Sequence, residues 1–107
     1  MTATSAQGWV VLTVDGEIDL ARQDELEDMV AANGDHASNV IFDLTQVTFM
    51  DSTGLGWLLR SQDMLTERGA RCAVVLPTAL DRLFTAAGIT GHFDIHRSIE
   101  DATGLSS

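Results

Sequence analysis

The sequence predicts an α/β fold, a single domain in which a small, mostly parallel sheet of four to five strands packs with about four helices. Short apolar runs alternate along the chain with longer segments whose apolar side chains recur at helical spacing. Strands joined through helices mostly form right-handed parallel units. A chain of 107 residues can build one core of its own, so residues 1–107 are expected to form one domain.

A strand and an amphipathic helix are expected in the first third of the chain. Residues 9–14 are rich in strand-forming side chains and end at Asp15-Gly16, a typical turn pair. Residues 20–33 are expected to form a helix that is capped by Asp19 and ended by Asn33-Gly34. The positions near one face of this helix are Leu20, Gln23, Leu26, Met29, Val30 and Asn33.

A buried strand and a long helix occupy the middle of the sequence. Residues 40–44 form a nearly unbroken apolar run, typical of a strand covered on both faces of a sheet, and a turn over residues 45–48 follows. Helical spacing then predicts a helix that begins at Ser52 or Thr53. It is expected to stop at Gly69, because a glycine there can adopt the left-handed conformation that ends many helices.

The last third of the chain is expected to hold a strand over residues 71–76, a helix ending at Gly88, a short strand over residues 93–95 and a helix from Ser98 to Leu105. Thr78 lies three residues before Asp81, which resembles a capping pair at the start of the first of these helices.

The chain is strongly acidic, with sixteen Asp and Glu residues against six basic residues and a net charge of −10. Ten of the acids lie in residues 1–51, together with a single arginine. This charge argues against nucleic acid and against anionic membrane surfaces as partners, because both would repel it. A basic protein partner and plain solubility explain the acidity equally well, and both stay open.

Several kinds of chemistry are not expected. All six basic residues are arginine, which rules out a Walker-A phosphate loop and a catalytic lysine. Cys72 is the only cysteine and lies in an apolar run, which predicts a buried thiol and no internal disulfide. His36, His92 and His96 form no pattern typical of metal ligands, so we expect surface histidines and no metal site.

No apolar run approaches the roughly 18 residues of a transmembrane helix, and Met1 to Gly8 lacks the charged and apolar regions of a signal peptide. A cytoplasmic protein is therefore expected. The segment before Trp9 is long enough for one edge strand at most.

The function is expected at a strand-to-helix junction, Phe49-Met50-Asp51-Ser52-Thr53-Gly54-Leu55-Gly56-Trp57. Ligands of open α/β sheets usually bind at the carboxyl ends of strands, where this stretch would lie. At a helix N-terminus the backbone N–H groups are unpaired and the dipole favours negative charge, so the Ser52 position would suit a phosphate. The simpler alternative is that Asp51, Ser52 and Thr53 only cap the helix.

An enzymatic role is not expected. Ser52 as a nucleophile would need a base within reach, and the sequence contains no recognised elbow motif or triad. Gly54-Leu55-Gly56 is only a fragment of a dinucleotide loop, so no catalytic residue and no cofactor are assigned. Trp57 shares a helix face with Met64, and spacing alone makes a place in the core and a place at a partner interface equally consistent.

Two stretches resemble the STAS domains of the anti-sigma factor antagonist family, and the order of strands and helices is similar over nearly the whole chain. The two stretches are Gly16-Glu17-Ile18-Asp19 and the longer, more specific Asp43-Leu44-Thr45-Gln46-Val47-Thr48-Phe49-Met50-Asp51-Ser52-Thr53-Gly54-Leu55-Gly56.

The resemblance implies a partner switch. In that family the unphosphorylated antagonist binds a kinase-type anti-sigma factor and so releases the sigma factor. The anti-sigma factor, an ATP-binding serine kinase, phosphorylates the serine directly after the motif aspartate, and a serine phosphatase restores the active form. The serine at this position is Ser52, with Thr53 as a less favoured site. The expected partner-binding residues are Glu17, Asp19, Asp51, Ser52, Thr53, Gly54, Leu55, Gly56 and Trp57.

A different hypothesis makes the domain a scaffold subunit of a larger signalling assembly or of a transporter accessory complex. An antagonist is expected to be a monomer when free, so the oligomeric state distinguishes the antagonist from the scaffold subunit. The chain also departs from the family at two positions, with Thr53 where a second serine is frequent and Trp57 where a small aliphatic residue is common.

Overall fold

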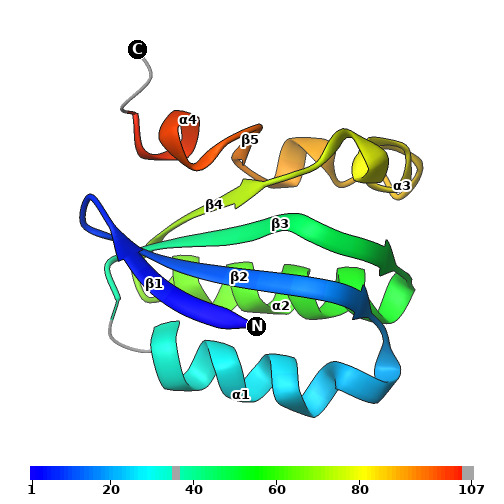
Figure 1. The fold of residues 1–107 in the computed structure, drawn as a ribbon, viewed down its shortest axis with the longest axis horizontal. Helices are drawn as coiled ribbons and strands as arrows, with labels where there is room; N and C mark the ends of the chain where they lie inside the picture. Colours follow the sequence, from blue (N-terminus) through cyan, green and yellow to red (C-terminus); the bar gives the residue numbers. More distant parts are fainter. Residues whose placement is uncertain (35–36, 105–107) are drawn as a thin grey trace.

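A five-stranded sheet forms the centre of the molecule in the computed structural model, which describes residues 1–34 and 37–104. The strands lie in the order β1-β2-β3-β4-β5, with β1 antiparallel to β2 and the other neighbours parallel (Figure 1). They are β1 (Thr2–Ala6), β2 (Trp9–Ile18), β3 (Asn39–Met50), β4 (Arg71–Val75) and β5 (Ile95–His96). The predicted α/β class is confirmed, and β1 is the edge strand for which the sequence left room.

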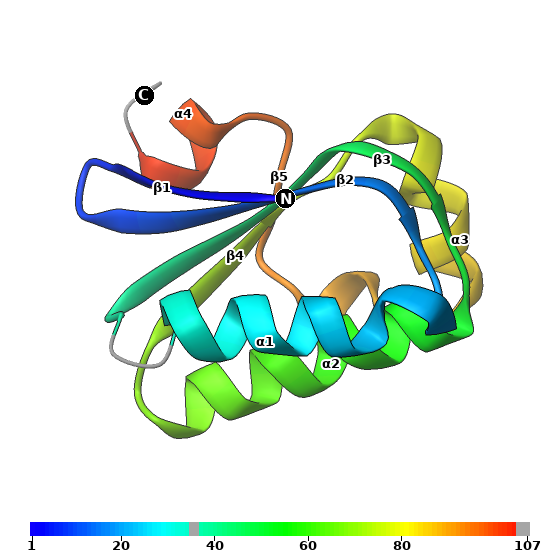
Figure 2. The same cartoon turned by 60° about the horizontal axis from the view of Figure 1, so that its bottom comes forward.

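Helices cover both faces of the sheet. The long helices α1 and α2 lie side by side on one face, and the short α4 packs against β4 and β5 on the other (Figures 1 and 2). α3 follows the end of β4 and adds Phe84 to the larger core. The helices are α1 (Gln23–Gly34), α2 (Ser52–Glu67), α3 (Asp81–Ala86) and α4 (Ile99–Thr103), with single 3-10 turns at Leu20–Arg22, Thr78–Leu80 and Thr90–His92.

Alternate side chains of β3 enter two apolar cores, which explains the unbroken apolar sequence of this strand. Val40, Phe42 and Leu44 are fully buried in the core that α1 and α2 cover. Ile41 is buried in the opposite core, together with Ala102 of α4. Each such side chain stabilises the fold by about 1.5–3 kcal/mol relative to an exposed position. Because both faces of β3 are buried, this strand contributes more to stability than a strand with one solvent-exposed face would.

Two predicted turns lie inside strands, and the prediction that they end strands is wrong. Asp15-Gly16 falls within β2 and residues 45–48 fall within β3, where Asp15 pairs with Gln46 and Gly16 with Val47. The register shifts twice in this region, and Gly16 has a φ of 71°. Glycine tolerates that angle, so the turn-forming pair produces an irregularity in a paired strand.

Arg22 fastens the irregular end of β2 to the start of α1. Its Nη1 donates hydrogen bonds to the carbonyl oxygens of Asp15 at 2.5 Å and Glu17 at 2.7 Å. The guanidinium also forms ion pairs with the carboxylates of Asp15 and Glu25, at 3.7 Å and 3.5 Å. Arg22 is the single arginine of residues 1–51, and its contacts stabilise the junction between β2 and α1.

Most of the predicted helix ends are confirmed. The Asp19 carboxylate caps the 3-10 turn before α1, and the Ser98 hydroxyl caps α4 by accepting from the N–H of Asp101 at 3.1 Å. α1 ends at Gly34, and α2 spans Ser52–Glu67 with Gly69, at a φ of 84°, just past its end.

The predicted capping pair at Thr78 and Asp81 is wrong. The Asp81 carboxylate instead accepts two hydrogen bonds from the Arg97 guanidinium, at 2.8 Å and 2.9 Å. This partner comes from the end of β5, so spacing within the helix could not reveal it. The last strand is also displaced, to Ile95–His96, and Phe93, which precedes it, is buried in the larger core. The predicted helix end at Leu105 and the position of His36 lie outside the described residues.

Candidate functional site

The candidate site lies where the parallel strands β2 and β3 end. Glu17 pairs with Phe49 and Ile18 with Met50, and the Asp51 N–H donates to the carbonyl oxygen of Ile18 at 3.4 Å. The residues that follow these two strands therefore start from neighbouring positions on one edge of the sheet. The two family-like stretches, which residues 20–42 separate in sequence, meet at this edge.

Each strand passes into its helix through an aspartate that caps the first turn. The Asp19 carboxylate accepts from the N–H of Ala21 at 3.1 Å. The Asp51 carboxylate accepts from the N–H of Gly54 at 3.1 Å, and its carbonyl oxygen accepts from Leu55 at 3.0 Å. The simpler capping interpretation is thus confirmed for Asp51, and the cap uses no atom of the Ser52 side chain.

Ser52 is exposed and is the first residue of α2. As in any α-helix, the first N–H groups have no acceptor inside the helix, and the positive end of the helix dipole lies here. A negatively charged group on the Ser52 oxygen would therefore be favourably placed. Thr53 is half-buried and is therefore less accessible than Ser52.

Gly54 sets the distance between α2 and β2. A methyl group at this position would lie 2.7 Å from both the Cγ2 and the carbonyl oxygen of Ile18, and 3.0 Å from Cγ of Met50. Only glycine leaves room for this approach, so the first turn of α2 is held against the last residue of β2. The position of Ser52 relative to Asp19 follows from this packing.

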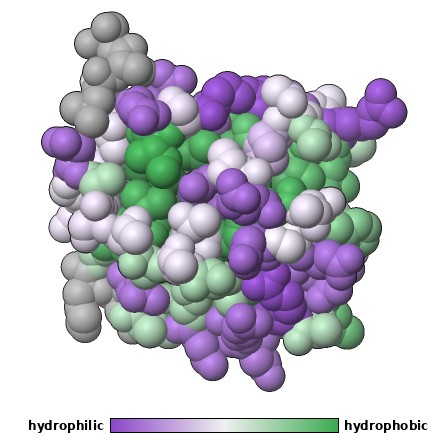
Figure 3. Space-filling view, in the orientation of Figure 1, coloured by the Kyte–Doolittle hydropathy of each residue, from purple (hydrophilic) through white to green (hydrophobic). Residues whose placement is uncertain are grey.

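Exposed apolar side chains surround the site. Leu20 is 70% exposed, directly after Asp19, and Phe49 is 49% exposed, two residues before Asp51. Glu17, opposite Phe49 on β2, is also exposed. Figure 3 shows small apolar patches among hydrophilic surface at the end of the molecule where β2 and β3 end in Figure 1. We call Glu17, Leu20, Phe49 and Ser52 the switch surface.

The sequence prediction for Leu20 is wrong, because it placed this side chain on the inner face of a helix that began at residue 20. Residues Leu20–Arg22 form a 3-10 turn instead, and the turn directs Leu20 outward. Phe49 belonged to the expected functional stretch but not to the expected contact residues. Phe49 lies opposite Glu17, just past a register shift between β2 and β3 that no pattern in β3 alone indicates.

Two of the expected partner-binding side chains are buried. Trp57 is 1% exposed and packs edge-on against the Phe42 ring, with the ring centroids 5.5 Å apart. Leu55 is 7% exposed in the same core. The structure therefore decides between the alternatives for Trp57 in favour of the core, and neither side chain is part of the switch surface.

Other reactive groups lie away from this site. His92 lies 3.3 Å from Asp63, and within residues 1–34 and 37–104 no group of three or more His, Cys, Asp or Glu side chains is arranged to hold a metal ion. Burial raises the pKa of the Cys72 thiol to about 12, with a smaller contribution from the negative charge of Asp94. A thiol with that pKa is protonated and unreactive at neutral pH. No helix in the described part of the chain is long and apolar enough to cross a membrane.

Comparison with known proteins places this geometry in a family context. The family model described as STAS domain matches residues 1–102. An anti-sigma factor antagonist from Mycobacterium paratuberculosis is 25% identical, with 99% of this chain and 92% of that chain covered and a TM-score of 0.75. A putative anti-sigma factor antagonist from Thermotoga maritima is 15% identical, with 96% and 91% covered and a TM-score of 0.87. A sulfate transporter family protein from Wolinella succinogenes is 16% identical, with 96% and 88% covered and a TM-score of 0.80.

The packing of Gly54 predicts that two glycines of the same helix respond oppositely to alanine. Gly54→Ala should lower the free energy of unfolding by about 1–3 kcal/mol, because the added methyl group meets the Ile18 backbone. Gly56→Ala is the matched control, since its methyl group meets only the end of the Arg60 side chain. It should raise stability by up to about 1 kcal/mol through helix propensity. Urea unfolding of both variants measures the difference, and equal effects would contradict the close contact.

Proposed function

This chain belongs to the STAS domain family, and on that basis we propose that it is an anti-sigma factor antagonist switched by phosphorylation of Ser52. The unphosphorylated form binds a kinase-type anti-sigma factor in the cytoplasm and thereby releases a sigma factor. The observation that carries the proposal is the exposed Ser52 hydroxyl at the start of α2, in a turn whose cap does not use it. The 25% identity to an anti-sigma factor antagonist over nearly the full length of both chains supports this class.

The local geometry supports a modification that leaves the fold unchanged. Asp51 caps α2 through its own carboxylate, so a phosphoester on Ser52 removes no hydrogen bond from the cap. The phosphate adds about −1.5 to −2 charges and three acceptor oxygens. The N–H groups and the dipole at the start of α2 offset part of that charge.

The switch would act on binding. Leu20 and Phe49 offer apolar area that a partner would bury beside Ser52. A dianionic group in the middle of that contact would lose its water, with Glu17, Asp19 and Asp51 as acidic neighbours on the same edge. A loss of about 2.8 kcal/mol weakens binding about a hundredfold, which is enough for a switch.

The chain itself would perform no chemistry in this scheme. The partner supplies the kinase active site and ATP, and a serine phosphatase removes the phosphate from Ser52 to restore binding. The proposed antagonist is a monomer when free. A role as a transporter scaffold has weaker support, because the 16% identity to the sulfate transporter family protein indicates a shared fold alone.

We expect phosphate transfer to depend on Ser52. The wild-type chain, mixed with ATP and the kinase-type anti-sigma factor that it captures from lysate, should gain one phosphate in intact-mass measurement. Ser52→Ala should gain none while it retains the wild-type unfolding transition, because its side chain is exposed and is not used in the cap. Thr53→Ala is the matched control and should be phosphorylated like wild type. Phosphate on Ser52→Ala, lost in Thr53→Ala, would move the site by one residue.

Leu20 and Phe49 of the switch surface are expected to make the main apolar contacts with the same partner. Leu20→Ala and Phe49→Ala should each weaken binding of the anti-sigma factor at least tenfold, because each removes a large side chain from the centre of the contact. Met64→Ala serves as control, since Met64 is 37% exposed but lies twelve residues along α2 from Ser52. Titration calorimetry measures all three affinities. Equal affinities for all three variants would place the partner on another face.

A further inference from the structure

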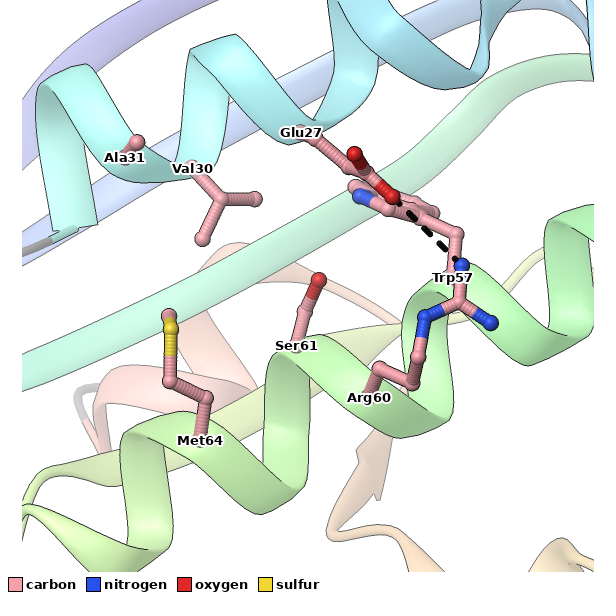
Figure 4. Close-up of a pocket in the computed structure, with 7 residues that line it drawn as sticks. All are labelled: Glu27, Val30, Ala31, Trp57, Arg60, Ser61 and Met64. Atoms are coloured by element: carbon pink, nitrogen blue, oxygen red, sulfur yellow. Dashed lines mark ion pairs between the residues drawn. The ribbon is translucent and has the colours of Figure 1, made fainter.

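A small cavity lies between α1 and α2, beyond the first turn of each helix. It has a volume of about 150 Å³ and is partly open to solvent. The residues that line it are Glu27, Val30, Ala31, Trp57, Arg60, Ser61 and Met64. Figure 4 shows Val30 of α1 and Trp57, Ser61 and Met64 of α2 pointing into the space between the helices. None of these residues except Trp57 was among the expected functional residues.

The Trp57 indole carries an unsatisfied hydrogen-bond donor at this cavity. The side chain is 1% exposed, and its Nε1 has no hydrogen-bond partner among the described residues. In Figure 4 the nitrogen lies at the end of the indole that faces the space near Val30 and Ser61. A buried N–H without an acceptor costs free energy, about as much as a lost hydrogen bond, so such groups are rare unless a ligand or another partner uses them.

The other residues that line the cavity determine which kind of ligand could bind beside the Trp57 N–H group. Val30, Ala31 and Met64 provide apolar contacts, and the methionine side chain can adapt to different shapes. Glu27 and Arg60 form an ion pair across the helices, at 3.6 Å, so their charges neutralise each other. An anion would also be repelled by the net charge of −10. These features together favour an uncharged ligand.

We propose that this cavity binds a small neutral molecule, an apolar ring or short chain with one hydrogen-bond acceptor that accepts from Trp57 Nε1. A cavity of this volume accommodates a single aromatic ring, so the ligand has roughly six to ten non-hydrogen atoms. The apolar part packs between Val30 and Met64, and its acceptor lies at the buried indole. This inference does not depend on the proposed phosphorylation switch.

The test uses two probes of nearly the same shape, acetophenone with a carbonyl acceptor and cumene without one. Nitrogen-15 spectra of the full chain report the indole N–H groups of Trp9 and Trp57 separately, with Trp9→Phe used to assign them. Acetophenone should shift the Trp57 indole resonance in a saturable way. Cumene should bind about tenfold more weakly, because it leaves the donor unsatisfied.

Two alanines of α1 supply a matched pair of variants. Ala31→Leu should abolish binding of both probes, because Ala31 lines the cavity and a larger side chain fills it. Ala32→Leu should leave binding unchanged, since Ala32 is exposed and does not line the cavity. Both changes place a strong helix former on an exposed helix position, so both variants should fold.

Three results would overturn the proposal. They are an indole resonance of Trp57 that does not respond to acetophenone, equal affinities for acetophenone and cumene, and unchanged binding in Ala31→Leu. A fourth variant, Trp57→Phe, removes only the donor and should make the two affinities equal. If that variant does not fold, the probe comparison in the wild-type chain still decides the role of the N–H group.

Discussion

The contact between Gly54 and Ile18 is the constraint on which the candidate site depends. It brings the first turn of α2 within van der Waals distance of the last residue of β2, with no room for a side chain at position 54. The hydrogen bond from the Asp51 N–H to the Ile18 carbonyl oxygen joins the same two segments. Because Asp19 follows Ile18 directly, the turns that begin α1 and α2 lie next to each other. A larger residue at position 54 would move Ser52 relative to every other part of the switch surface.

The site separates the groups that hold the structure from the group that is proposed to change. Asp19 and Asp51 are engaged with backbone N–H groups, and Arg22 is engaged with the carbonyl oxygens at the end of β2. Ser52 is exposed and directly follows Asp51 in the chain. This arrangement allows a large local change in charge at little cost in stability, which is the physical requirement for a switch that acts through binding.

Local signals in the sequence were sufficient to predict α2 and its caps. They were insufficient to predict the bounds of strands that pair with distant parts of the chain. Asp51, Ser52 and Gly69 indicate the ends of α2 because capping and the left-handed conformation are decided within a few residues. Asp15-Gly16 has the same turn-forming character but lies inside β2, because β3 pairs with it from more than thirty residues away. Leu20 and Trp57 show the same limit. Both occupy plausible apolar positions on helices, yet the 3-10 turn exposes Leu20 and the sheet buries Trp57.

Phosphate on Ser52 is proposed to change the affinity for the anti-sigma factor and to leave the fold intact. The most direct test compares fully phosphorylated and unmodified chains in two measurements, the melting temperature and the dissociation constant for the anti-sigma factor. We predict melting temperatures within about two degrees of each other, since a difference of that size corresponds to well under 1 kcal/mol in a domain of this length. We also predict a dissociation constant about a hundredfold higher for the phosphorylated chain. Equal dissociation constants, or a phosphorylated chain that melts many degrees lower, would contradict this proposal.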